Sequence, residues 1–186
     1  QEILKRMADS YRRMRNTARF LLGNLDGFDP ERDALPMQSL VAVDRWALAR
    51  TAELQREILA AYAAYEFHRV YQQLHNFCVV DLGAFYLDVI KDRLYTTPRG
   101  GMPRRSAQTA MWHIAEAMVR WLAPILSFTA EEIWRFLPGQ RAGSVQLSTW
   151  HELPAVPASD VDWAKLLGVR ELAARALELR REAGAI

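Results

Sequence analysis

Basic side chains follow one flank of the first predicted helix. Lys5, Arg12, Arg15 and Arg19 are separated by seven, three and four residues, so an α-helix aligns them along one side. Acidic neighbours are scarce, because residues 1–24 contain six Lys or Arg and only two acids. Such a row of cations can bind the phosphates of a polyanion, or it can be a solvated helix surface.

A second basic segment brackets a loop of Thr, Pro and Gly at residues 96–103. Tyr95 precedes this loop, and a basic loop with an aromatic neighbour suits phosphate binding and base stacking. The alternative is a solvated loop without a ligand. A nucleic-acid site is better supported if these cations and those of residues 5–19 share one surface. The cations of the segment, opposed only by Asp92, are Lys91, Arg93, Arg99, Arg104 and Arg105.

Other reactive side chains do not form a convincing catalytic or metal site. His68, His75 and Cys78 follow one helix, but two or three ligands without a fourth make a poor metal site. No third group orients a Cys–His pair for nucleophilic catalysis, and Cys78 falls on an apolar stripe. Residues 129–132 have the pattern of a capping box, which accounts for the two adjacent glutamates. We therefore predict no catalytic residue and no metal ligand.

Composition indicates one globular domain, or a large domain with a small appendage. Of the 186 residues, 51% are hydrophobic and 25% are charged, and the net charge of +2 favours a local basic patch over a general polycation. The single cysteine excludes an internal disulfide. The chain offers neither a signal-peptide core nor an apolar run of the ~20 residues that a membrane span needs, so we expect a cytoplasmic protein.

Apolar periodicity predicts an all-α fold. We expect an antiparallel bundle of about five to six helices over residues 1–150, with a short extended strap at residues 144–150. Asp44 is the predicted N-cap of the second helix, and Tyr65 begins a predicted turn. The third helix, which is apolar on most sides near residues 77–86, is the predicted centre. We expect residues 151–186 to form a linker and a C-terminal helix, which either packs weakly on the bundle or leads to a region absent from this chain. The predicted helices span residues 2–24, 45–65, 67–95, 105–122, 129–137 and 160–183.

Several segments resemble the anticodon-binding domain of bacterial isoleucyl-tRNA synthetase, in the order of that family and over nearly the whole chain. Residues 16–20 and 91–95 resemble the isoleucyl branch in particular. The segments are YRRMRNTARFLLGNLDGFDP at 11–30, DRWA at 44–47, AYAAYEFH at 61–68, FYLDVIKDRLY at 85–95, RRSAQTA at 104–110, HIAE at 113–116 and APILSFTAEEIW at 123–134.

The resemblance implies that this chain is a fragment of an ATP-dependent isoleucine–tRNA ligase. In that family a catalytic domain with an inserted editing domain precedes the bundle, and a region with a cysteine zinc site follows it. ATP, Mg²⁺ and zinc would bind outside this chain, which therefore needs no cofactor and is expected to be catalytically inactive. Its implied partners are the anticodon stem-loop of isoleucine tRNA and the catalytic and C-terminal domains of the parent chain.

Two alternatives accompany this assignment. The bundle could come from a closely related valyl- or leucyl-type synthetase, or it could be a structural support without direct RNA contact. If it binds RNA, cations neutralise phosphates while polar and aromatic groups read unstacked bases. The predicted RNA-binding residues are Arg12, Arg15, Arg19, Lys91, Arg93, Arg104 and Arg105.

Overall fold

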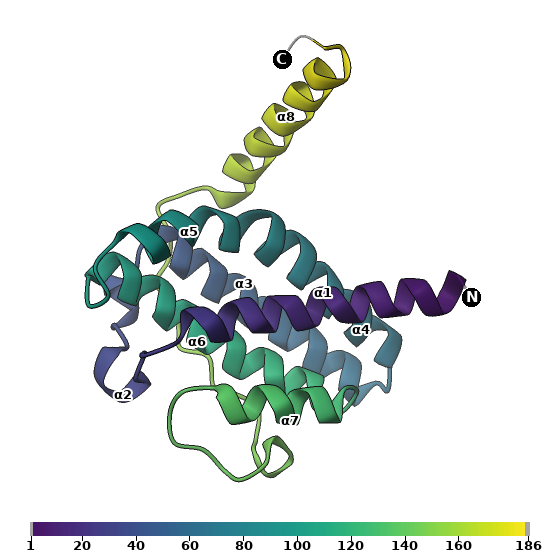
Figure 1. Ribbon diagram of the computed structural model, residues 1–186, viewed down its shortest axis with the longest axis vertical. Coiled ribbons are helices and arrows are strands. Elements are labelled where there is room, and N and C mark those ends of the chain that lie inside the picture. The colour runs from purple at the N-terminus through teal and green to yellow at the C-terminus, as the bar shows by residue number, and fades with distance from the viewer. Residues whose placement is uncertain (1, 185–186) are drawn as a thin grey trace.

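The computed structural model describes residues 2–184, and within them it contains helices and no strand (Figure 1). The predicted all-α bundle is confirmed. None of the described helices has the length and apolar character that crossing a membrane requires. The elements are α1 (Glu2–Asn24), α2 (Pro30–Asp33), the 3₁₀ turn η1 (Met37–Ser39), α3 (Ala42–Ala63), α4 (Phe67–Asn76), the π-helix η2 (Phe77–Tyr86), α5 (Leu87–Thr96), α6 (Met102–Leu122), α7 (Ser127–Phe136), the 3₁₀ turn η3 (Val145–Leu147) and α8 (Trp163–Glu182).

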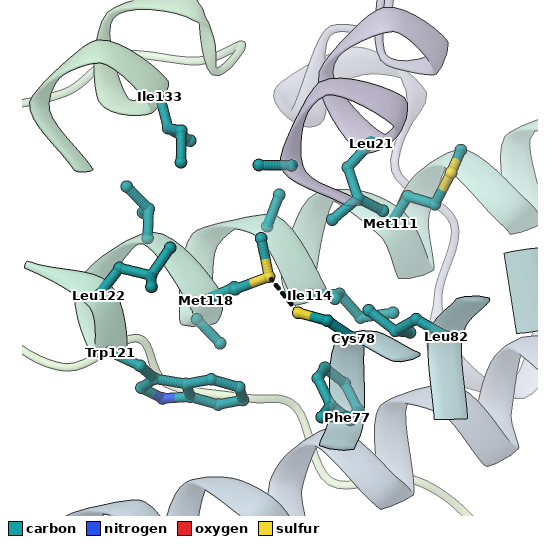
Figure 2. Packing of buried hydrophobic residues seen from close by; sticks show 14 of the residues in the cluster. Leu21, Phe77, Cys78, Leu82, Met111, Ile114, Met118, Trp121, Leu122 and Ile133 are labelled. Carbon is teal, nitrogen blue, oxygen red and sulfur yellow. Dashed lines mark hydrogen bonds between the residues drawn. The ribbon is translucent and has the colours of Figure 1, made fainter. Parts of the chain in front are cut away.

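Helix α6 is the centre of the bundle, and the prediction of a central third helix was wrong. Of its 21 residues, 14 are buried, whereas η2 has five buried residues out of ten. Alanines at 107, 110, 115 and 117 let neighbouring helices approach α6 from several sides. Figure 2 shows the core around it, where Trp121 meets the edge of Phe77 and the thiol of Cys78 lies 3.8 Å from the sulfur of Met118. Cys78 is thus a buried apolar group, and burial raises its pKa to about 12.

The run from α4 through η2 to α5 is continuous, and the turn before it occurs where it was predicted. Tyr65 has a φ of +57°, a left-handed conformation that breaks the path between α3 and α4. Inside η2 the wider π turns bring the backbone close to Gly83. A Cβ at this position would lie 2.9 Å from the carbonyl oxygen of Cys78, so the packing there requires glycine.

Asp44 is not the N-cap of its helix, because α3 begins at Ala42 and Asp44 lies inside its first turn. The side chain is fully buried. Arg93, Tyr86 and Ser106 all donate hydrogen bonds to its carboxylate, Arg93 at 2.7 and 2.8 Å and Tyr86 at 2.9 Å. The Ser106 hydroxyl also accepts a hydrogen bond of 2.8 Å from the backbone N–H of Val41, just before the helix. One carboxylate therefore connects α3, η2, α5 and α6.

The predicted capping box at residues 129–132 is also absent. Helix α7 begins at Ser127, and no side chain caps its first turn. Glu131 instead accepts a hydrogen bond from the hydroxyl of Ser144, and Glu132 forms an ion pair with Arg15 on α1. Both carboxylates therefore make tertiary contacts that the local sequence pattern does not reveal.

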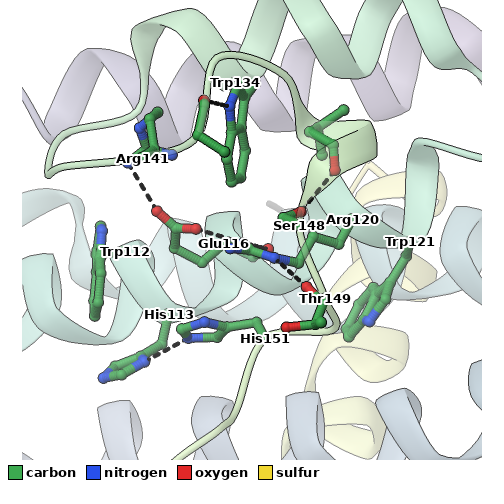
Figure 3. Close-up of polar contacts among 12 residues, drawn as sticks. Trp112, His113, Glu116, Arg120, Trp121, Trp134, Arg141, Ser148, Thr149 and His151 are labelled. Atoms are coloured by element: carbon green, nitrogen blue, oxygen red, sulfur yellow. Dashed lines mark hydrogen bonds and ion pairs between the residues drawn. The ribbon is translucent and has the colours of Figure 1, made fainter.

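Residues 138–151, called the strap below, pack across α6 (Figure 3). They include the strap predicted at 144–150, but Val145–Leu147 form the 3₁₀ turn η3 and are not extended. Arg120 and Arg141 both pair with the nearly buried carboxylate of Glu116. At the end of the strap, Nε2 of His151 shares a hydrogen bond of 2.9 Å with Nδ1 of His113 on α6. The strap thus covers α6 with one charged cluster and one pair of neutral histidines.

Helix α8 projects from the rest of the molecule (Figure 1), and its residues are almost all exposed. Its first residue, Trp163, packs against Trp46 and Phe85, with ring centroids 5.8 and 6.4 Å apart. Arg170 lies over the Phe85 ring and donates a hydrogen bond of 2.6 Å to the carbonyl of Ala84. The first two turns of α8 are thereby attached to the bundle. The division of the chain into a bundle at residues 1–150 and a C-terminal part at residues 151–186 stays a prediction.

We predict that Asp44→Ala lowers the free energy of unfolding by about 3 to 5 kcal/mol, because the buried Tyr86 and the largely shielded guanidinium of Arg93 would lose their acceptor. Urea denaturation followed by circular dichroism measures the loss. Asp88→Ala is the matched control, since it removes an exposed carboxylate that pairs with Lys91 at 2.9 Å. It should change stability little. Equal losses in the two variants would contradict the role given to Asp44.

We also predict that the protein becomes less stable on acidification from about pH 7 to about pH 5. Burial lowers the pKa of His113 to about 3 and that of His151 to about 4, from an ordinary value of 6.5. As the pH falls below 6.5, the unfolded chain takes up protons that the folded chain does not, so stability declines until the folded-state pKa values are reached. Urea midpoints across this range test the prediction, and His151→Gln should make their pH dependence shallower.

Candidate nucleic-acid interface

The surface where α7 lies against α1 carries the most complete candidate site. Beneath it, Ala18 and Leu21 of α1 and Ala130 and Ile133 of α7 are all buried, which fixes the two helices side by side. The exposed flank of α1 next to this seam is the one that holds the basic row. We call the exposed surface along this seam the α1–α7 surface.

The arginines of the basic row differ in their partners. Arg12 pairs with Asp9 on its own helix at 2.7 Å. Arg15 donates from Nη2 to both carboxylate oxygens of Glu132, at 3.0 and 3.2 Å. This hydrogen bond is the main reason that the pKa of Arg15 is raised. Arg19 is exposed and forms no ion pair with any residue from 2 to 184. Among the three arginines of the row, Arg19 alone has no carboxylate partner in the described residues, and Lys5 near the start of α1 is likewise exposed and without an ion pair there.

Two adjoining hollows lie on the α1–α7 surface, and Arg19, Leu22 and Phe136 line both of them. The larger has a volume of about 500 Å³ and extends past the glycines that follow α1. The smaller, of about 210 Å³, also contacts Arg15 and Glu132. Phe136 is 70% exposed at the end of α7, an unusual position for a large apolar ring. The hollows combine a cation with an exposed aromatic face, which suits a nucleotide.

Two glycines leave part of the rim of the larger hollow without side chains. Gly23 and Gly27 line it, and a Cβ added at either would meet no atom within 4 Å. Gly27 has a φ of +71°, so the turn after α1 favours glycine there. Asp26 and Phe28 complete the wall, the former exposed and the latter buried. The hollow is consequently open at these two glycines, while Arg19, Leu22 and Asp26 contribute side chains to its lining.

The second basic segment is largely occupied by internal contacts. Arg93 binds the buried Asp44, as described above, and Arg104 donates a hydrogen bond of 2.6 Å to the carbonyl of Leu94. Lys91 is exposed and pairs with Asp88 at 2.9 Å. The contact of Arg93 joins α5 to α3, that of Arg104 joins α6 to α5, and the Lys91 pair lies within α5. RNA contact by Lys91, Arg93 and Arg104 stays a prediction.

Arg105 lies close to the larger hollow but faces α2. It pairs with Asp33 at 3.0 Å, and its guanidinium lies 5.8 Å from the ring centroid of Phe28. The pKa of the Asp33 carboxyl is lowered to about 2, first by a hydrogen bond from Arg32 and further by the charge of Arg105. Arg105 thus contacts Phe28 but does not itself line the hollow, and contact between Arg105 and RNA also stays a prediction.

Neither the exposure of Phe136 nor the role of Glu132 is evident from the sequence pattern. Phe136 falls just before Pro138 and Gly139, and a large aromatic residue at a helix end next to a turn is a weak signal for exposure. The partnership of Arg15 and Glu132 spans 117 positions in the chain, so no local pattern indicates it. Within residues 2–184, no group of three or more His, Cys, Asp or Glu side chains is arranged to hold a metal ion.

Comparison with known proteins agrees with the resemblance noted in the sequence. A family model described as the anticodon-binding domain of tRNA ligase matches residues 44–184. Isoleucine–tRNA ligase of Halorhodospira halophila is 61% identical over 185 residues, which cover 97% of this chain. The corresponding enzymes of Nitrosococcus oceani and Pseudomonas aeruginosa are 59% and 56% identical over the whole chain. In each case the chain spans about a fifth (20%) of the relative's length.

The matched residues run from the first turn of α3 to the end of α8, and the alignments with the relatives extend over α1 as well. The helical architecture, the family match and the high identities agree with one another. The chain belongs to the family of anticodon-binding domains of tRNA ligases.

Proposed function

We propose that this domain binds the anticodon stem-loop of isoleucine tRNA through the α1–α7 surface. The observation that carries the proposal is the pair of hollows centred on Arg19 and Phe136, in a domain whose relatives are isoleucine–tRNA ligases. In this proposal the domain positions the tRNA, and a catalytic domain elsewhere in the parent protein attaches isoleucine.

The basic row supports the phosphate contacts of this proposal. Arg12, Arg15 and Arg19 succeed one another at intervals of three and four residues on the exposed flank of α1. An RNA backbone that follows the helix can meet them in turn, and each phosphate neutralised releases counterions and adds affinity. Arg19 contributes first, because its charge has no carboxylate partner among the described residues.

The hollows support contacts with unstacked bases. Sequence-specific RNA recognition mostly targets loop bases that stack on aromatic rings and present their edges to polar groups. Phe136 offers an exposed ring, and the carboxylate of Asp26 and the guanidinium of Arg19 stand beside the same hollow. A volume of about 500 Å³ accommodates a nucleobase with its sugar.

The second basic segment has a supporting role in this proposal. Arg93, Arg104 and Arg105 hold the ends of α5, α6 and α2 in place. Lys91 and Arg99 are exposed on the same segment and stay candidates for additional phosphate contacts. A purely structural role thus fits part of the second basic segment. The features of the α1–α7 surface instead support RNA binding.

For the parent protein we propose ATP-dependent isoleucine–tRNA ligase activity in the cytoplasm. ATP with Mg²⁺ and the zinc site of the family would then belong to the four-fifths of the relatives' length that this chain does not span. The catalytic and C-terminal domains of the parent chain would be its other partners. An isolated domain with this role binds the stem-loop without activating isoleucine.

Replacing Arg19 with alanine should weaken binding of a synthetic isoleucine-tRNA anticodon stem-loop about fivefold and lower the slope of log affinity against log salt by about one. Fluorescence anisotropy at about 50 and about 200 mM salt provides both values. Arg56→Ala is the matched control, because Arg56 is an exposed arginine of α3 without an ion pair in the described chain. Equal effects of the two substitutions would refute a specific phosphate contact at Arg19.

Loss of the aromatic ring in Phe136→Ala should weaken stem-loop binding about tenfold and leave the salt slope unchanged, because stacking involves no charge. Phe128→Ala removes an equally apolar ring from α7 that is 93% exposed and lines neither hollow. The proposal expects no change in that variant. If Phe136→Ala binds the stem-loop like the unmodified domain, the proposal that a base stacks on Phe136 is wrong.

A further inference from the structure

Glu132 places a negative charge in a site that is proposed to bind phosphate, where a carboxylate is unexpected. Its carboxylate lines the smaller hollow together with Arg15, Arg19 and Phe136. The Glu132 side chain is 53% exposed and that of Arg15 is 40% exposed, so solvent and ligand can reach both partners. A phosphate that enters this hollow therefore meets a negative charge beside the two arginines.

Docking of α7 on α1 has other supports besides this ion pair. Ala130 and Ile133 are buried against α1, and Tyr11 shares a hydrogen bond of 3.1 Å with Thr129 one turn before Glu132. Exposed ion pairs contribute little to stability because solvent screens them. The Arg15–Glu132 pair is consequently not needed to hold the helices together, and its position within the hollow calls for another explanation.

We propose that Glu132 is an internal competitor of RNA phosphate, which holds Arg15 in the free domain and releases it when the RNA backbone binds. The inference rests on the proposed function and adds a control of affinity to it. Both carboxylate oxygens of Glu132 accept from Nη2 of Arg15, as phosphate oxygens would. A bound phosphate must either replace the carboxylate at Arg15 or tolerate its repulsion, and each course weakens binding.

The competition has a consequence for selectivity among anions. Arg15 is neutralised in the free domain, so a polyanion that contacts only this residue gains little. An RNA that also engages Arg19 and the ring of Phe136 has enough additional contacts to displace the carboxylate. When such an RNA leaves, Glu132 takes Arg15 back, which favours release of the tRNA after each cycle.

The test is the affinity of Glu132→Gln for the isoleucine-tRNA anticodon stem-loop, measured by fluorescence anisotropy at about 50 and about 200 mM salt. Glutamine keeps the size of the side chain and removes its charge. We expect affinity to rise about three- to tenfold and the salt slope to steepen by about one, because Arg15 becomes available to phosphate. Thermal unfolding of the variant should be nearly unchanged.

Two further variants separate this mechanism from a general charge effect. Glu178→Gln removes the same charge beside an exposed arginine, Arg181, on α8 at the far side of the molecule from α7 (Figure 1). It should leave affinity unchanged. The double variant with Arg15→Ala and Glu132→Gln should bind no more tightly than Arg15→Ala alone, because the carboxylate of Glu132 acts through Arg15.

The possible outcomes differ for the two proposals. If the unmodified domain binds no stem-loop at low salt, the proposed function fails and this inference fails with it. If the domain binds but Glu132→Gln matches Glu178→Gln, the proposed function stands and the competitor role is overturned. A gain that persists without Arg15 also overturns it.

Discussion

One buried carboxylate fixes much of the arrangement described above. Asp44 has no exposure to solvent, and a carboxylate in that environment is tolerated only when charged and polar donors surround it. Arg93, Tyr86 and Ser106 supply those donors from three different elements. The requirement to satisfy Asp44 therefore sets the relative positions of α3, η2, α5 and α6. It also withdraws Arg93 from the surface, although its sequence neighbours Lys91 and Arg99 are exposed.

The same requirement divides the cations of the chain into two classes. Arg93, Arg105 and Arg141 each satisfy a carboxylate that is largely shielded from water, on Asp44, Asp33 and Glu116 respectively. Arg12, Arg15 and Arg19 lie on the flank of a helix whose opposite face is buried, so their side chains keep access to solvent. A guanidinium paired with a carboxylate that is shielded from water is held strongly in the fold. A guanidinium on an exposed helix flank is held weakly and can bind a ligand. Local residue counts do not distinguish these classes, because the decisive carboxylate comes from elsewhere in the chain.

Periodic apolar residues allowed most of the fold to be predicted, since a helix with one buried face repeats at three and four residues. The bounds of α1 match the prediction, and its end follows from the Gly23–Asn24 stop signal. The turn at Tyr65 was predicted because one unbroken helix of about 50 residues would be unusual in a compact domain. Predictions from capping patterns failed at Asp44 and at Thr129, because tertiary donors and acceptors took over the side chains that a local cap would use. The central position of α6 was also missed, because alanine packs closely yet adds little to an apolar stripe.

The candidate site could be predicted only in part, for a related reason. Its cations form a visible row on one helix, but its aromatic ring and its carboxylate come from α7, more than a hundred positions away. Residues 1–24 contain few acids, which in isolation indicates an unneutralised stripe. In the folded domain Glu132 neutralises Arg15 from outside that segment, and Arg19, one helical turn further on, stays without such a partner in the described chain. The electrostatic character of the α1–α7 surface is therefore a property of packing: the helix supplies the charges, and the helix against which it packs determines which of them a ligand can reach.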